Sequence, residues 1–200
     1  MSTFRRNNVQ GGFSLIELVI VIVILGILAA TALPRFLDVT DEAKIASMEG
    51  VAGGFATGVS LVRAQWESEA RPQDAVGNVV IYDTVQIYLT TGDTANGIAA
   101  GYPLATSANV GLPIDATRCL EVWEAIFQNP SPASTDIGGV QDNGYYVATA
   151  ADPNGIQACA YYQVNSLVKS GGGYTAPSGT DVGNNFTYQP QTGQVLTNVN

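Results

Sequence analysis

The pattern of apolar and polar positions marks one long apolar stretch near the start of the chain. Residues 13–33 are almost entirely aliphatic and contain one charged side chain, Glu17. A helix of this length is about 30 Å long, at roughly 1.5 Å per residue, which matches the hydrocarbon core of a bilayer. The pattern therefore predicts a transmembrane helix. A carboxylate near its start is costly in lipid and is expected to serve a purpose.

A second pattern follows Pro34, where apolar residues recur at steps of three and four along one helix face. Its members are Met48, Ala52, Phe55, Val59, Val62 and Trp66. We expect residues 34–70 to continue the first helix as an amphipathic helix whose stripe packs on a sheet. Arg71-Pro72 is expected to end it. Pro34 lacks an amide hydrogen, so a kink is predicted there.

Four glycines interrupt the helical pattern, at Gly50, Gly53, Gly54 and Gly58. Each lowers helix propensity by up to about 1 kcal/mol. Small residues on one side of a helix allow another backbone to approach closely. We expect that backbone to be a neighbouring subunit or a sheet.

Short alternating runs and turn residues dominate residues 71–200, which predicts a β-rich head. Three hairpins are expected, along with a loop over Thr90–Pro113 and a short helix capped by Asp115. The predicted hairpin strands are 79–82 with 85–89, 143–150 with 156–165, and 186–189 with 194–199, and the predicted helix covers 116–128. A helical spine followed by an antiparallel sheet is an α+β fold.

The charge balance is acidic, with 17 Asp and Glu against 8 Lys and Arg. Nucleic acid is therefore not an expected partner, because phosphate binding needs clustered cations.

Two cysteines, Cys119 and Cys159, lie beyond the apolar stretch, and the chain has no histidine. A chain exported across a membrane meets an oxidising compartment, so we predict one disulfide between them. Two thiols without histidine do not make a zinc site, and no metal or other cofactor is expected.

Residues 1–12 form a short basic segment in which Arg5 and Arg6 precede the apolar stretch, so a cytoplasmic N-terminus is predicted. Three fates of this segment compete. It remains as an uncleaved anchor, it belongs to a secretory signal peptide cut near Ala30-Thr31-Ala32, or it is a leader cut between Gly12 and Phe13. Glu17 and the amphipathic continuation favour the third, since a removable signal peptide needs neither.

Gly12-Phe13-Ser14-Leu15-Ile16-Glu17, followed by the apolar helix and Pro34, resembles the class III signal of type IV prepilins and pseudopilins. The resemblance implies cleavage after Gly12 by prepilin peptidase, methylation of the Phe13 amine, and storage in the inner membrane of a Gram-negative bacterium. Assembly machinery would then polymerise the chain with other pilin subunits into an extracellular pilus for adhesion or surface attachment. It also implies that the helix around Pro34 can melt and extend.

Glu17 has a specific role in that scheme. Cleavage exposes an ammonium group at Phe13, and an unpaired charge in a medium of low dielectric costs several kcal/mol. Pairing within one chain is available, since i and i+4 are neighbours on a helix. The resemblance favours pairing of Glu17 with the Phe13 ammonium of a neighbouring subunit, which makes Glu17 the key to the assembly register.

The strings 49–56 and 63–66 resemble the mannose-sensitive haemagglutinin branch of type IV pilins. Two alternatives remain at this point. One is a type II secretion pseudopilin, and the other is a secreted binding domain or enzyme with a removable signal peptide.

We expect no enzymatic activity, because no histidine is available for a Ser-His-Asp or Cys-His site. Glu121 and Glu124 flank Trp123 but are predicted on the solvent side of a helix. Asp93, Asp142 and Asp152 have the composition of calcium loops, and turn chemistry is the preferred explanation. Tyr145, Tyr146, Tyr161 and Tyr162 are expected to pack across strands rather than bind sugars.

Overall fold

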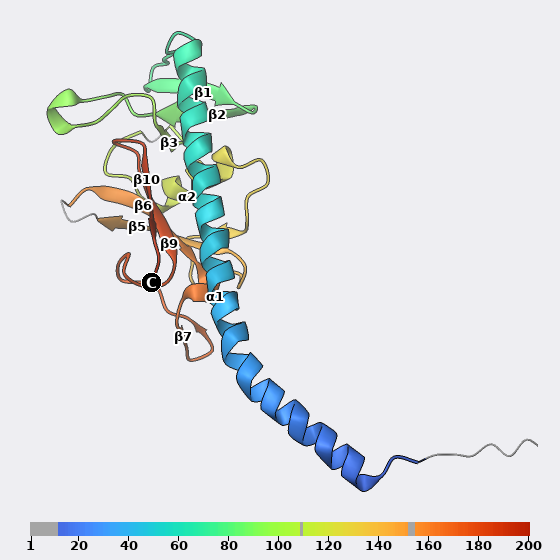
Figure 1. Cartoon of the computed structure of the whole chain (residues 1–200). Coiled ribbons are helices and arrows are strands. Elements are labelled where there is room, and N and C mark those ends of the chain that lie inside the picture. Colours follow the sequence, from blue (N-terminus) through green and yellow to red (C-terminus); the bar gives the residue numbers. More distant parts are fainter. Residues whose placement is uncertain (1–11, 109, 152–154) are drawn as a thin grey trace, which may run out of the picture. The chain divides into compact units, whose positions relative to one another are not determined.

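A computed structural model describes residues 12–108, 110–151 and 155–200, in which a long helix is followed by β-rich elements (Figure 1). The predicted α+β class is confirmed. Leader residues 1–11 and the predicted turn at 152–154, including Asp152, lie outside the described residues. The chain divides into two compact units, Met1–Ala43 and Lys44–Asn200.

Helix α1 spans Leu15–Ser68 and is continuous through Pro34. The kink at Pro34 stays a prediction. The helix ends two residues before the predicted limit of 70, because Ala70 and Arg71 adopt positive φ angles of 62° and 61° ahead of Pro72. Among the described residues, α1 is the one helix long and apolar enough to cross a membrane, and none of the residues in its most apolar stretch is buried.

A three-stranded antiparallel sheet, in the order β1-β2-β3, forms one part of the second unit. Strands β1 (Asn78–Tyr82) and β2 (Val85–Leu89) make the predicted hairpin across Asp83-Thr84. Both turn residues have positive φ, as a tight two-residue hairpin requires. The predicted loop over Thr90–Pro113 is wrong in part. It contains the 3-10 helix η1 (Thr94–Asn96) and strand β3 (Pro103–Ala105), which pairs with β2.

A five-stranded sheet in the order β10-β9-β6-β5-β4 forms the other part, and a small hairpin joins β7 to β8. The two remaining predicted hairpins, β5–β6 and β9–β10, are confirmed as antiparallel pairs, whereas β4 pairs parallel to β5. The strands are β4 (Ala133–Ser134), β5 (Tyr145–Ala151), β6 (Gln157–Gln163), β7 (Lys169–Ser170), β8 (Gly173–Tyr174), β9 (Asn185–Gln189) and β10 (Gln194–Asn198), and 3-10 helix η2 (Val164–Ser166) follows β6.

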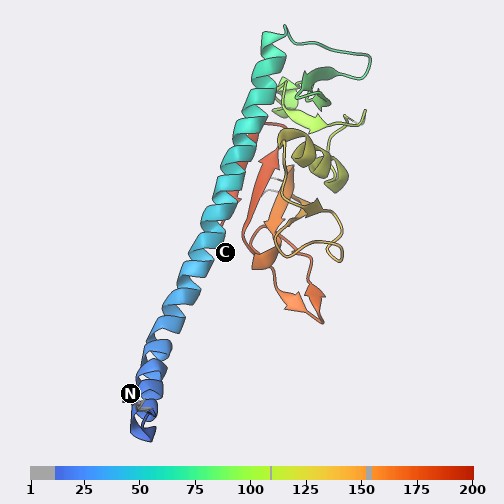
Figure 2. The same ribbon diagram turned by 90° about the vertical axis from the view of Figure 1, so that its right-hand side faces the viewer.

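The core of the second unit lies between α1, the short helix α2 (Ala116–Ile126) and the sheets (Figure 2). All six residues of the predicted α1 stripe are buried, which confirms the period and the side that faces inward. Phe55 is fully buried, and its ring centroid lies 5.1 Å from that of Tyr161 and 5.4 Å from that of Tyr188. This aromatic cluster joins the helix to β6 and β9.

Helix α2 begins as predicted, because the Asp115 carboxylate accepts a hydrogen bond from the Arg118 backbone N–H. It ends at Ile126, two residues before the predicted Gln128, since Phe127 leaves the helical region with φ −95° and ψ 129°. The predicted disulfide is present between Cys119 of α2 and Cys159 of β6. Both cysteines are fully buried, so the bond crosses the core.

The four glycines in the second half of α1 divide into two pairs. A methyl group at Gly58 would overlap the Ile126 side chain, and one at Gly54 would lie 3.5 Å from the Phe127 ring. At these two positions the close approach is to the end of α2, and not to the neighbouring subunit or sheet that the sequence predicted. At Gly50 and Gly53 an added methyl group would meet nothing within 4 Å.

Candidate functional site

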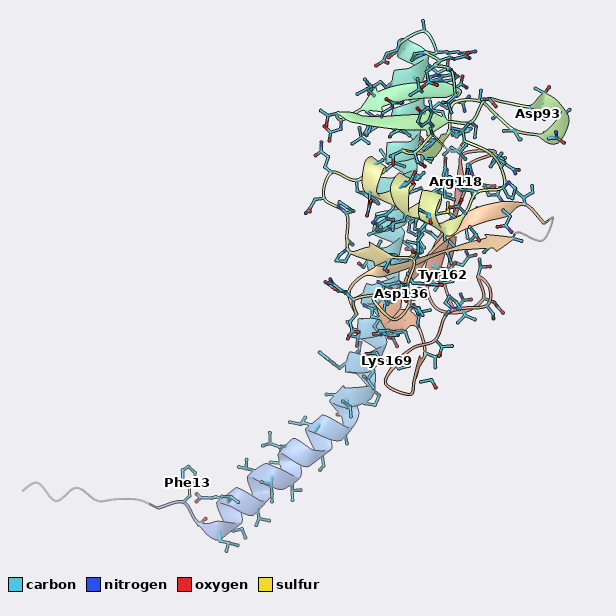
Figure 3. The ribbon with its side chains drawn as sticks, turned by 180° about the vertical axis from the view of Figure 1, so that it is seen from behind. Phe13, Asp93, Arg118, Asp136, Tyr162 and Lys169 are labelled. Carbon is cyan, nitrogen blue, oxygen red and sulfur yellow. A yellow bond between two sulfur atoms is a disulfide. The ribbon has the colours of Figure 1, made fainter. Side chains whose placement is uncertain are left out.

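The predicted processing site lies at the beginning of the described chain. Gly12 and Phe13 precede the first helical residue, Leu15, so the peptide bond between them is outside α1. The Phe13 side chain is 92% exposed and projects away from the helix (Figure 3). A bond placed ahead of a helix, between a residue without a side chain and an exposed phenylalanine, is open to a peptidase.

Glu17 is held by Ser14 in a reciprocal arrangement. The Ser14 backbone N–H and hydroxyl both donate to Glu17 Oε2 at 2.8 Å, and the Glu17 N–H donates to Ser14 Oγ at 3.3 Å. This is a capping box, in which the first residue and the one three places later satisfy each other's free amides at the start of a helix.

The sequence reasoning missed this capping box, although its Ser-x-x-Glu spacing is readable in Ser14 and Glu17. In the uncut chain the nitrogen of Phe13 belongs to a peptide bond and carries no charge. The carboxylate therefore has a local partner before any cleavage, and pairing with a Phe13 ammonium becomes available only afterwards.

The first unit has a second functional feature, a helix surface that is apolar all round. The large aliphatic side chains from Leu15 to Leu28 are exposed, as are Leu33, Phe36 and Leu37 beyond them. A soluble monomer rarely exposes a contiguous apolar surface of this extent, because each buried methylene group is worth about 0.8 kcal/mol. This surface therefore needs a cover, such as lipid or an apolar surface of another protein chain.

The carboxylates considered for catalysis have structural surroundings. Glu124 is exposed, as predicted, whereas Glu121 is half-buried, which corrects its placement on the solvent side. Glu121 Oε2 accepts hydrogen bonds at 2.9 Å from the backbone amides of Thr106 and Ser107 and from the Ser107 hydroxyl. Glu121 therefore ties the segment after β3 to α2.

The aspartates considered for calcium have turn or surface roles. Asp93, at the projecting loop in Figure 3, caps η1 by accepting from the backbone amides of Ala95 and Asn96, which confirms the turn explanation there. A hydrogen bond from the Asn96 side chain is the main cause of the lowered pKa of Asp93. Within the described ranges no group of three or more histidine, cysteine or acidic residues could hold a metal ion.

Asp142 does not serve its own turn, as the turn explanation expected, because its partners come from the β7–β8 hairpin. Tyr174 Oη donates to Asp142 Oδ1 at 2.7 Å, and Lys169 Nζ lies 3.4 Å from Oδ2 (Lys169 is labelled in Figure 3). The tyrosine hydrogen bond, followed by the lysine charge, lowers the pKa of Asp142.

The four tyrosines considered for sugar binding lie on paired strands, as predicted. Tyr145, Tyr161 and Tyr162 are buried, and Tyr146 packs against Tyr162 with ring centroids 6.1 Å apart. Burial raises the pKa of Tyr145 and Tyr162 to about 12. The cross-strand packing prediction is confirmed.

Comparison with known proteins covers both the N-terminal region and most of the chain. Residues 7–33 match the prokaryotic N-terminal methylation motif. The chain is 34% identical to fimbrial protein Q of Moraxella bovis over 152 residues, which cover 76% of this chain and 86% of that protein. It is 48% identical over 54 residues to the type IV narrow pilus major component PilA5 of Thermus thermophilus, covering 27% of this chain and 47% of that protein.

A further relative is a fimbrial protein of Moraxella nonliquefaciens, 36% identical over 99 residues that cover 47% of this chain and 64% of that protein. The chain thus spans about half to two thirds of the length of PilA5 and of this relative. No solved structure matches it.

Proposed function

Because the chain belongs to the type IV pilin family, we propose that it is a structural subunit of a type IV pilus. The observation that carries this proposal is the apolar helix surface directly behind a methylation motif. Lipid covers that surface before assembly, and the helices of other subunits cover it in the filament. The same surface is thereby buried in two successive environments without a change of fold.

We infer that prepilin peptidase cuts between Gly12 and Phe13 and methylates the new amine. A methylated amine keeps its positive charge, so Phe13 then presents a cation four residues before Glu17. The capping box supports cleavage first and charge pairing second, because Ser14 already donates hydrogen bonds to Glu17 in the uncut chain.

The mass of the mature N-terminus tests the processing. A start at methylated Phe13 is expected. A start at Leu33, after Ala30-Thr31-Ala32, would instead indicate signal peptidase and a released secreted domain, and would overturn the proposal.

We propose that Glu17 sets the register of assembly by pairing with the Phe13 ammonium of a neighbouring subunit. In an apolar surrounding, registers that leave either charge unpaired are disfavoured by several kcal/mol. Glu17→Ala should leave cleavage largely intact and abolish filaments. Glu17→Asp is the matched control, because it keeps the charge on a shorter side chain. Normal filaments from Glu17→Ala would refute the register role.

We place the precursor in the inner membrane of a Gram-negative bacterium, with a cytoplasmic N-terminus, and the assembled subunit in an extracellular pilus. The pilus assembly machinery is its proposed partner, and we propose no enzymatic activity. The abundance of the chain in sheared filaments separates a major subunit from a minor one.

The branch of the family is a finer proposal. The strings 49–56 and 63–66 support the mannose-sensitive haemagglutinin branch. Mannose-inhibited agglutination of red cells by the wild-type filament is the expected result, and agglutination that is indifferent to mannose would count against this branch.

A further inference from the structure

A groove on the second unit lies between α1 and the edge strand β10. It has a volume of about 410 Å³ and is lined by Glu49, Ala52, Gly53, Ala56, Val195, Leu196 and Thr197, which we call the α1–β10 groove. Strand β10 is at the end of the five-stranded sheet, so no further strand covers this side (Figure 1). Leu196 is 45% exposed within it, and a methyl group added at Gly53 would meet nothing within 4 Å.

The groove is apolar except for the carboxylate of Glu49 and the hydroxyl of Thr197. Glu49 is exposed, and no ion pair joins it to another described residue. An occupant of matching chemistry is therefore an apolar segment that carries a single positive charge.

Such a segment exists in this chain at residues 33–37, Leu-Pro-Arg-Phe-Leu. Phe36 is 70% exposed, and Leu33 and Leu37 are exposed beside it. Four of its five residues follow the predicted membrane span of residues 13–33, so the bilayer core does not account for the apolar side chains of Phe36 and Leu37.

Arg35 in this segment is distinctive among the cations in the described part of the chain. It makes no hydrogen bond, ion pair or ring contact with another described residue, whereas every other described lysine and arginine has a partner. Arg63 contacts Tyr102, Arg71 pairs with Glu67, Arg118 with Asp115 and Lys169 with Asp142, and Lys44 also has a partner. Arg35 and Glu49 cannot pair within one helix, because they are 14 residues apart on α1, which is about 21 Å along the helix axis.

We propose that residues 33–37 of a second copy of this chain occupy the α1–β10 groove, with Arg35 of that copy paired to Glu49. The contact joins two different surfaces of the same chain, so it is heterologous. Repeated contacts of this kind that do not close into a ring build an open helical filament. The inference rests on the proposed pilus function and assigns one contact between its subunits.

Charge exchange tests the pair in the full chain. Arg35→Glu and Glu49→Arg should each lower the yield of sheared filaments by about tenfold or more, because each places like charges together. The double variant restores the attraction with reversed signs and should recover most of the wild-type yield. Glu124→Arg is the matched control, an exposed helical glutamate outside the groove, and should leave the yield unchanged.

Filling the groove tests its occupancy without using charge. A methyl group at Gly53 meets nothing within 4 Å and the groove beside it is open, so Gly53→Leu should fold, yet its side chain should fill the groove and block filaments. Gly50→Leu is the same change one turn earlier on α1 at a position that does not line the groove, and it should assemble. The mass of methylated Phe13 confirms that each variant was inserted and processed.

The outcomes separate this inference from the function on which it rests. Absence of filaments from the wild-type chain would contradict the pilus function itself. Wild-type yields from Glu49→Arg or Gly53→Leu would overturn the groove contact alone. Two defective single variants that the double variant does not rescue would also overturn it, because Glu49 would then have a partner other than Arg35.

Discussion

The contact between Gly58 of α1 and Ile126 of α2 gives a sharp test of how the two helices pack. A methyl group at position 58 would overlap Cγ2 of Ile126, whereas one at position 50 meets open space. Both glycines lie inside the same helix. Gly50→Ala and Gly58→Ala are therefore the same chemical change on the same element, with and without a neighbour.

Two opposing contributions set the change in the free energy of unfolding that each substitution causes. Replacing glycine by alanine inside a helix stabilises it by about 1 kcal/mol at either position. Overpacking a closed contact costs about 1–3 kcal/mol, because side chains and backbone must shift. We expect Gly50→Ala to raise the free energy of unfolding by about 0.5–1 kcal/mol, and Gly58→Ala to lower it by about 1 kcal/mol.

The two tryptophans provide the assay. Trp66 and Trp123 are both buried in the second unit, so their fluorescence reports its unfolding. The full chain is unfolded by urea in a mild detergent that holds the apolar helix. A double-mutant cycle with Ile126→Ala, which removes the obstructing methyl group, should give a coupling of about 1–2 kcal/mol between positions 58 and 126.

The result that would refute this reasoning is equal stabilisation by Gly50→Ala and Gly58→Ala. The reasoning would also be refuted if the effects of Gly58→Ala and Ile126→Ala on the free energy of unfolding were additive in the double variant. Either outcome would show that α1 and α2 are not in contact at Gly58.

Three further predictions concern the same unfolding measurement. Replacing both Cys119 and Cys159 by serine opens a loop of 40 residues and should cost about 4 kcal/mol in the chain-entropy description, while reductant should have no effect on that variant. Phe55→Ala should cost about 3–5 kcal/mol because it empties the centre of the aromatic cluster, and Phe55→Leu, which fills part of the space, should cost less. Asp115→Ala should cost about 1–2 kcal/mol at neutral pH, because it removes both the α2 cap and the carboxylate paired with Arg118. Asp115→Asn keeps the cap acceptor and loses only the charge, so it should cost less. The hydrogen bond from the Arg118 amide lowers the pKa of Asp115, so the charged form stabilises the fold above the unfolded pKa. The difference between wild type and Asp115→Asn should therefore shrink as pH falls through the lowered pKa, and a difference that grows in acid would contradict this cause.

Local patterns in the sequence predict the elements that depend on near neighbours. The buried stripe from Met48 to Trp66 follows from the helix period, and the β1–β2 turn follows from Asp83-Thr84 between alternating strands. The capping box of Ser14 and Glu17 is equally local and was readable from its spacing. The chain has two cysteines and no histidine, so a disulfide between Cys119 and Cys159 was the simplest prediction.

Contacts between residues far apart in the sequence were not readable in this way. Strand β3 has three residues and begins with proline, so it resembles a loop until Pro103 and Ala105 are placed beside β2. Glu121 was expected in solvent because its own helix suggests an outer face, but the segment after β3 returns to cover it.

By itself the sequence determined the processing motif, the helical spine, the three hairpins and the disulfide, because periodicity, turn chemistry and cysteine count act over short distances or admit one solution. Only the tertiary structure decided which α1 glycines meet α2, which partners hold Asp142, and that Glu49 lies in an open groove beside β10. These depend on which surfaces the folded chain brings together, and a pattern along one element contains no information about its neighbour.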